Sequence, residues 1–269
     1  SSNRLYELMG PDYINQKLVE KGLVNTVINH RLSVPMTETQ NRSVNPIRFT
    51  DGAGKTILSL PQRISHKEYF NATKPTLGNG YYSQGKLINT PMDFTYKNRL
   101  SLVDLDGVVK RVIFPELFSL SQQFHLRPSD RDLMLSYMSM LPPESVTPQY
   151  PVAKYPHNYS KFFMFAGEAQ QLPEHIRIFN KTGSAYGHSL DAAYIVDFAN
   201  KVEFFLTAII YTNENGILND DQYQLEQIGE PFLNQLGNYI YQWELKREKK
   251  HPADLSEMLQ YAKQNSEIE

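Results

Sequence analysis

Apolar residues recur at spacings of three to five along several stretches of the chain, the pattern of helices that bury one face. It predicts a helix over residues 3–24, interrupted by a turn at Gly10-Pro11. It predicts another over 102–113 that ends at Pro115, because proline cannot continue a helix.

Two further helices are expected in the second half of the chain. One covers about 130–141 and begins with Ser129 as a cap after Pro128. The other covers about 221–247, and its apolar residues define one face that a sheet or other helices must cover. That face comprises Leu225, Ile228, Phe232, Leu236, Ile240 and Trp243.

Strands are indicated where the spacing changes. Residues 42–98 hold short apolar stretches among Gly, Pro and Asn, which is typical of small strands and long loops. Alternation and β-branched content predict strands at 174–182, 190–198 and 202–212, the last two joined as a hairpin around 199–201. Helices segregated around antiparallel strands make the expected fold class α+β.

The composition excludes several classes of function. Lys plus Arg number 27 and Asp plus Glu 29, a net charge of −2, so the basic surplus of a nucleic-acid-binding protein is missing. Zero Cys excludes thiol catalysis, Cys-ligated zinc and disulfides, and the seven His show no metal-ligand spacing. We therefore expect no nucleic-acid partner, no metal and no cofactor.

Two short motifs imitate known sites. Asp51–Thr56 resembles a phosphate-binding loop, but Phe49 stands where its first Gly is required, so a surface hairpin turn is expected. Gly187–Asp191 resembles a nucleophile elbow, but Asp191 occupies a position that needs a small residue and the following sequence is strand-like.

The strongest candidate site is Lys181-Thr182-Gly183-Ser184, which ends a predicted strand. A Lys there places a positive charge beside the sheet edge, and the Thr182 hydroxyl can bind a substrate carboxylate. Gly183 leaves room for a ligand against the strand, and the backbone N–H of Ser184 can hold an oxyanion. The alternative is an edge strand with a solvated Lys and a Gly bulge.

These residues and their order resemble the serine β-lactamase and penicillin-binding protein superfamily, closest to class A β-lactamases, whose motifs are S-x-x-K, S-D-N and K-T-G. Asn3–Pro11 is similar to the helix after the S-D-N loop, and His30–Leu32 to the approach to the omega loop. Lys181–Ser184 matches the third motif, and 190–212 with 221–247 match the end of that fold.

The resemblance implies acyl transfer by a serine nucleophile. Lys181 would supply positive potential, Thr182 would bind the substrate carboxylate, and the Ser184 N–H would form half of an oxyanion hole. In the family, the nucleophile motif precedes the S-D-N loop. We therefore expect it upstream of residue 1, in a longer precursor, because the sequence opens without an initiator Met. Ser83-Gln84-Gly85-Lys86 has the motif's letters but lies in a Gly-rich loop, so we interpret it as a coincidence.

The resemblance also implies an omega-loop carboxylate that activates the deacylating water. Met36 occupies that position, and Glu38, two residues later, is the candidate substitute. The interval between Asn3 and Lys181 exceeds that of a compact class A enzyme, which places a strand-rich insertion at about 42–98.

The leading hypothesis is that residues 1–250 form the C-terminal portion of a β-lactamase-like domain, with 251–269 as a charged tail. By resemblance it would be a periplasmic or otherwise exported serine hydrolase that acts on β-lactam or D-alanyl peptide amides, completed by the missing N-terminal segment. The alternative hypothesis is a non-catalytic, penicillin-binding-like module that binds a peptide or a protein partner.

Overall fold

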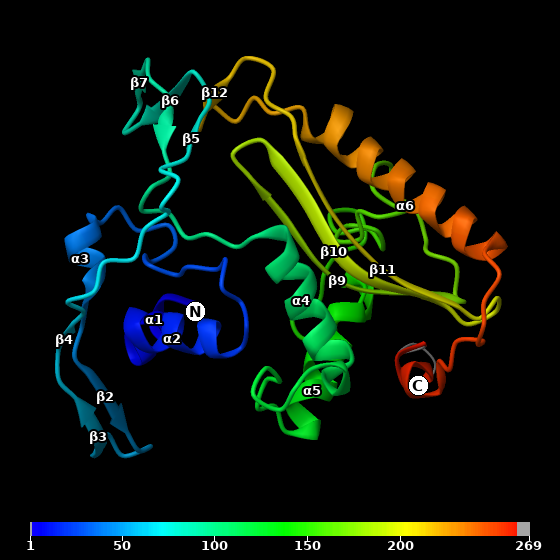
Figure 1. Ribbon diagram of the computed structural model, residues 1–269, viewed down its shortest axis with the longest axis horizontal. Coiled ribbons are helices and arrows are strands. Elements are labelled where there is room, and N and C mark those ends of the chain that lie inside the picture. Colours follow the sequence, from blue (N-terminus) through cyan, green and yellow to red (C-terminus); the bar gives the residue numbers. More distant parts are fainter. Residues whose placement is uncertain (1, 263–269) are drawn as a thin grey trace. The chain divides into compact units, whose positions relative to one another are not determined.

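The computed structural model describes residues 2–262 and is mixed α+β, with small antiparallel sheets and several helices (Figure 1). The chain divides into two compact units. Unit 1 comprises Ser1–Tyr81, Ile88–Asp104 and Leu120–Gln122, and unit 2 comprises Tyr82–Leu87, Leu105–Ser119 and Gln123–Glu269.

The centre of unit 2 is a three-stranded antiparallel sheet in the order β11-β10-β9. Its strands are β9 (Ile176–Ala185), β10 (His188–Asp197) and β11 (Val202–Tyr211). All three strands predicted in this part of the sequence are confirmed, as is the hairpin turn, in which Lys201 has a φ of 51°. Both pairings keep an unbroken register, so each residue's face follows from strand alternation.

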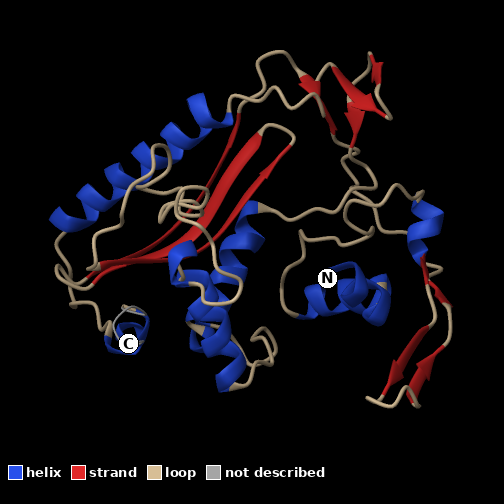
Figure 2. Cartoon of the chain, turned by 180° about the vertical axis from the view of Figure 1, so that it is seen from behind, coloured by secondary structure: helices blue, strands red, loops and turns tan. Residues whose placement is uncertain are grey.

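Helices cover both faces of this sheet (Figure 2). One face packs on α4 (Leu102–Ile113), α5 (Pro128–Ser139) and the 3-10 helix η4 (Ser256–Tyr261). The other packs on α6 (Glu230–Lys246), which follows a π-helical turn, η3 (Leu225–Gly229). Since neighbouring residues of a strand point to opposite faces, unit 2 has two apolar cores, one on each side of the sheet.

Short elements complete unit 2. The 3-10 helices η1 (Pro115–Leu117) and η2 (Pro142–Glu144) follow α4 and α5. The segment Tyr82–Leu87 of unit 2 carries parts of β6 (Gly80–Ser83) and β7 (Lys86–Ile88), which belong with β12 (Ile217–Leu218) to a sheet of order β12-β6-β7. The 3-10 helix η4 lies in the segment expected to form a charged tail, and it contributes Met258 and Tyr261 to the core on the α4 side. The last residues of that expected tail, 263–269, lie outside the described residues.

Unit 1 consists of short helices and two-stranded antiparallel sheets, paired β1-β4, β2-β3 and β5-β8. The small strands expected between residues 42 and 98 are present. Its elements are α1 (Ser2–Met9), α2 (Pro11–Glu20), α3 (Glu38–Arg42), β1 (Ser43–Val44), β2 (Ile47–Thr50), β3 (Thr56–Leu60), β4 (Arg63–Ile64), β5 (Thr76–Leu77) and β8 (Met92–Asp93).

Unit 1 is held together largely by buried polar groups. The Glu7 carboxylate accepts hydrogen bonds from Arg31 Nε at 3.2 Å and Asn45 Nδ2 at 2.9 Å. Asp104 accepts from the Thr26 hydroxyl at 2.7 Å. Buried polar groups must find such partners, so these bonds fix the loops of a unit that has few strands to do so.

Two predictions about helices need correction. Helix α5 begins at Pro128 and Arg127 is its N-cap residue, not Ser129, because proline is favoured at the first helical position. The buried face of α6 is also displaced from the predicted one: Phe232 and Trp243 are 42% and 53% exposed, whereas Leu233 is buried. A glycine sets this displacement, since Gly237 brings the helix backbone against Phe163 and Met164.

This close approach predicts that Gly237→Ala lowers stability. A Cβ at Gly237 would lie 2.6 Å from the backbone nitrogen of Met164. Alanine favours a helix over glycine by only about 1 kcal/mol, whereas overpacking costs about 1–3 kcal/mol. We expect a lower midpoint in urea unfolding. Gly52→Ala is the matched control, since nothing lies within 4 Å of its added Cβ. A Gly237→Ala midpoint equal to that of the control would contradict the close packing of α6.

Candidate functional site

Lys181, Thr182, Gly183 and Ser184 lie together in the C-terminal half of β9, the edge strand of the central sheet. Lys181 and Ser184 are exposed, and Thr182 and Gly183 are half-buried. The strand positions these residues because its first five residues are fully buried between the two apolar cores. The predicted motif is therefore the exposed continuation of a rigidly held strand.

The backbone of β9 shows which groups of the motif face outward. Ile176 N donates to Pro173 O at 2.9 Å, and Ile178 O accepts from Lys161 Nζ at 2.8 Å. Neither partner belongs to β10, so residue 176 and residue 178 point their backbone groups away from the sheet. Backbone direction alternates along an antiparallel strand, and the register with β10 is unbroken. The N–H groups of Thr182 and Ser184 therefore point outward as well.

The side chains of the motif divide between the two faces. Lys181 Nζ donates a hydrogen bond to the Thr182 carbonyl, which holds the ammonium beside the outer edge. Gly183 lies opposite Leu190, and a Cβ added at Gly183 would meet the Leu190 side chain at 3.3 Å. Packing against Leu190 is therefore enough to explain a glycine at position 183. That Gly183 leaves room for a ligand stays a prediction.

A buried lysine anchors the strand immediately before the motif. Lys161 is 1% exposed, and its Nζ donates to Met138 O and Ile178 O at 2.8 Å each and to Asn180 Oδ1 at 2.7 Å. These acceptors match the three N–H groups of an ammonium. One charge thus joins the end of α5 to the outer edge of β9.

Asn180 links Lys161 to the neighbouring strand, β10. Its Nδ2 donates to the two oxygens of Asp191 on β10, at 2.9 and 3.0 Å. The same carboxylate accepts from the backbone N–H groups of Phe162 and Phe163. Burial raises the pKa of Asp191 and lowers that of Lys161, because each charged form is removed from water.

No functional role was predicted for Lys161 or Asn180, and Asp191 was noted only as the residue that breaks the nucleophile-elbow motif. The available signal was Asp191, an acidic residue directly before the apolar stretch 192–196 of a predicted strand. A charge in such a position requires a buried partner. The partner could not be identified, since Lys161 lies in a Pro-rich connection with no periodicity.

Glu38 occupies a different part of the molecule. It is the first residue of α3 in unit 1, whereas the β9 motif belongs to unit 2. Thr37 and Gln40 form a capping box around the helix start, and Glu38 Oε1 forms an ion pair with Arg42 Nε at 2.8 Å. The carboxylate is thus already paired, and its role in deacylation stays a prediction.

The three motifs that we did not assign to a functional site have ordinary structural roles. Ser83 and Lys86 flank a two-residue hairpin turn, in which Gln84 and Gly85 have φ values of 49° and 73°, so this tetrapeptide does not open a helix. Ser189 lies buried inside β10 and not at an elbow. Asp51 Oδ1 caps the turn of the β2–β3 hairpin by accepting from two backbone N–H groups, at 3.0 and 2.9 Å.

Comparison with known proteins gives no assignment for this site. No model of a known protein family matches the chain, and no curated protein matches it significantly. In residues 2–262, no group of three or more His, Asp or Glu side chains is arranged to hold a metal ion. Within the same range, no helix has the length and apolarity needed to cross a bilayer.

The Lys161 network predicts that replacing Lys161 lowers the stability of the protein far more than replacing Lys181. Lys161→Met removes the donor of three buried acceptors and the cation whose charge acts on the buried Asp191, and leaving a buried charge uncompensated costs about 3–5 kcal/mol. Lys181→Met changes an exposed side chain and should alter stability by less than about 0.5 kcal/mol. Urea unfolding of both variants tests this. Equal midpoints would show that Lys161 does not anchor β9.

Proposed function

We propose that this chain supplies the Lys-Thr-Gly wall of an exported serine hydrolase similar to class A β-lactamases. The substrate is an amide that carries a nearby carboxylate, either a β-lactam or a D-alanyl peptide. The nucleophilic serine comes from a segment outside these 269 residues, since Ser83, the one serine with S-x-x-K spacing that we considered, flanks a hairpin turn.

The observation that carries the proposal is the outward direction of the Thr182 and Ser184 N–H groups beside the exposed ammonium of Lys181. A backbone N–H on a free strand edge is a fixed donor that needs no reorganisation when negative charge develops on a carbonyl oxygen. The lysine adds positive potential at the same edge. Both features suit an anionic acyl group.

The layered packing of unit 2 also supports the proposal. The β-lactamase-like fold that the sequence resembles places its third motif on a strand of an antiparallel sheet with helices around it. Here β9 lies between the core of α4 and α5 and the core of α6. This arrangement holds the motif rigid on one side and leaves its outer edge accessible.

The reaction follows the chemistry of acyl transfer. The serine oxygen forms a bond to the amide carbonyl carbon, the C–N bond breaks, and the serine proton passes to the departing nitrogen. Water then hydrolyses the ester and restores the serine hydroxyl. During both additions the carbonyl oxygen is negative, and the Ser184 N–H stabilises it. Thr182 orients the substrate through its carboxylate.

The proposal predicts covalent labelling of the full-length protein by a fluorescent penicillin. Thr182→Val removes a hydroxyl that hydrogen-bonds a charged group, an interaction worth about 1.5–3 kcal/mol, so the labelling rate should fall about 10- to 100-fold. Thr56→Val, on the exposed strand β3, is the matched control and should label at the wild-type rate. Labelling is followed by gel fluorescence and intact mass.

Absence of any adduct on the full-length protein would remove the enzyme proposal. Noncovalent penicillin binding that still depends on Thr182 would then favour the alternative, a binding module that has lost acylation. That alternative has one specific observation in its favour, namely that the Glu38 carboxylate is engaged by Arg42.

A further inference from the structure

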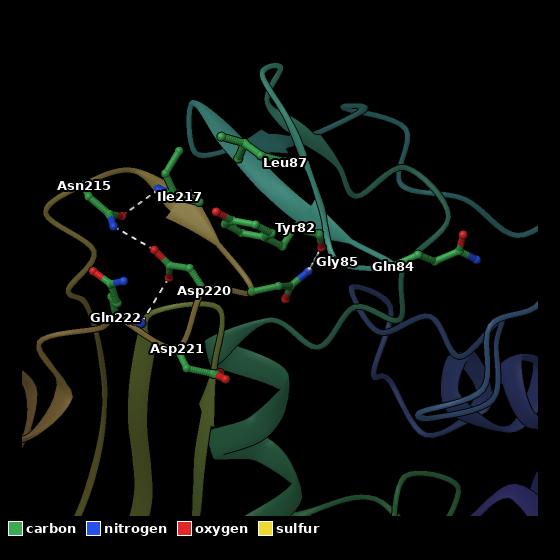
Figure 3. Close-up of a pocket in the computed structure, with 10 residues that line it drawn as sticks. Tyr82, Gln84, Gly85, Leu87, Asn215, Ile217, Asp220, Asp221 and Gln222 are labelled. Carbon is green, nitrogen blue, oxygen red and sulfur yellow. Dashed lines mark hydrogen bonds between the residues drawn. The ribbon is translucent and has the colours of Figure 1, made fainter.

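A hollow in unit 2 lies between the Tyr82–Leu87 hairpin turn and the loop that follows β11 (Figure 3). Its volume is about 670 Å³. Ligand-binding clefts commonly occupy about 300–1,000 Å³, so the hollow has the size of a small-molecule site.

The loop wall of this hollow is braced by its own side chains. Asn215 Oδ1 accepts from Ile217 N at 2.8 Å, and Asn215 Nδ2 donates to Asp220 Oδ2 at 2.7 Å. Asp220 Oδ1 in turn accepts from Gln222 N at 3.0 Å. These bonds, drawn as dashed lines in Figure 3, hold the loop in place and do not involve the side chains of Asp221 and Gln222.

The opposite wall contributes apolar surface. Tyr82 and Leu87 are 40% and 44% exposed, and Ile217 is half-buried across from them. Asn219 Nδ2 donates to Tyr82 O at 3.2 Å, which ties the loop to the hairpin. Figure 3 shows the Tyr82 ring directed toward the loop, so an aromatic face borders the hollow.

The charged and polar lining restricts the class of ligand. No Lys, Arg or His lines the hollow among residues 2–262, whereas Asp220 and Asp221 do, so anions are disfavoured. The side chains of Asp221 and Gln222 have no hydrogen-bond partner in the described part of the chain and remain available. A carboxylate accepts and an amide both accepts and donates, which suits hydroxyl groups.

We infer that this hollow binds a neutral oligosaccharide. A sugar ring has an apolar face that packs on the Tyr82 ring and a rim of hydroxyls that hydrogen-bond Asp221 and Gln222. Leu87 and Ile217 extend the apolar contact to a second ring. The inference does not depend on the acyl-transfer proposal, because none of these residues belongs to β9.

Calorimetric titration of the purified protein with chitotetraose and cellotetraose tests the inference. We expect saturable binding of at least one of them. Tyr82→Ala and Asp221→Ala should each weaken it about tenfold, a loss of about 1.4 kcal/mol. Tyr239→Ala is the matched control, since Tyr239 is 72% exposed on α6 and does not line the hollow. It should bind as the wild type does.

Three results would overturn the inference. The first is no binding of either glycan, and the second is glycan binding unchanged in both Tyr82→Ala and Asp221→Ala. The third is binding of tri-lysine, but of neither glycan, with loss in Asp221→Ala, which would assign the hollow to a cationic peptide. The two variants lie on different walls, so a folding defect in one leaves the other as the test.

Discussion

The buried ammonium of Lys161 is the interaction on which the arrangement of unit 2 depends. It joins the end of α5 at Met138 to the outer edge of β9 at Ile178, and through Asn180 it is linked to Asp191 on β10. A charge without water is tolerated only when its donors are satisfied, so this geometry permits little variation. The edge of β9 is therefore fixed at the residue where the exposed motif begins.

The position of this anchor explains how one strand can both pack in the core and carry the candidate site. Up to Asn180 the strand is buried, and its outward Ile176 N and Ile178 O form hydrogen bonds with Pro173 and Lys161. From Lys181 onward the strand is exposed or half-buried, and its outward N–H groups point away from β10. Among residues 2–262 the N–H groups of Thr182 and Ser184 have no hydrogen-bond partner, and under the proposed function they would bind an anionic group at little entropic cost, since they are preorganised.

Local patterns predicted the elements of the sheet and its helices, because alternation in β9 and helical spacing in α4 follow directly from which side chains are buried. They did not predict which face of α6 is buried, since the close approach of Gly237 to Met164 is a long-range contact. The Lys161 network could not be predicted from the sequence either, because it joins residues from four separate segments. The motif at Lys181 could be found in the sequence, but the direction of its N–H groups required the register with β10.

Amide hydrogen exchange at the motif tests the central claim most directly, namely that β9 presents outward N–H groups at Thr182 and Ser184. Measured residue by residue by NMR, the amides of Lys181 and Gly183 should be protected by their bonds to β10, and those of Thr182 and Ser184 should exchange far faster. Equal protection at all four positions, or the reverse alternation, would contradict the account.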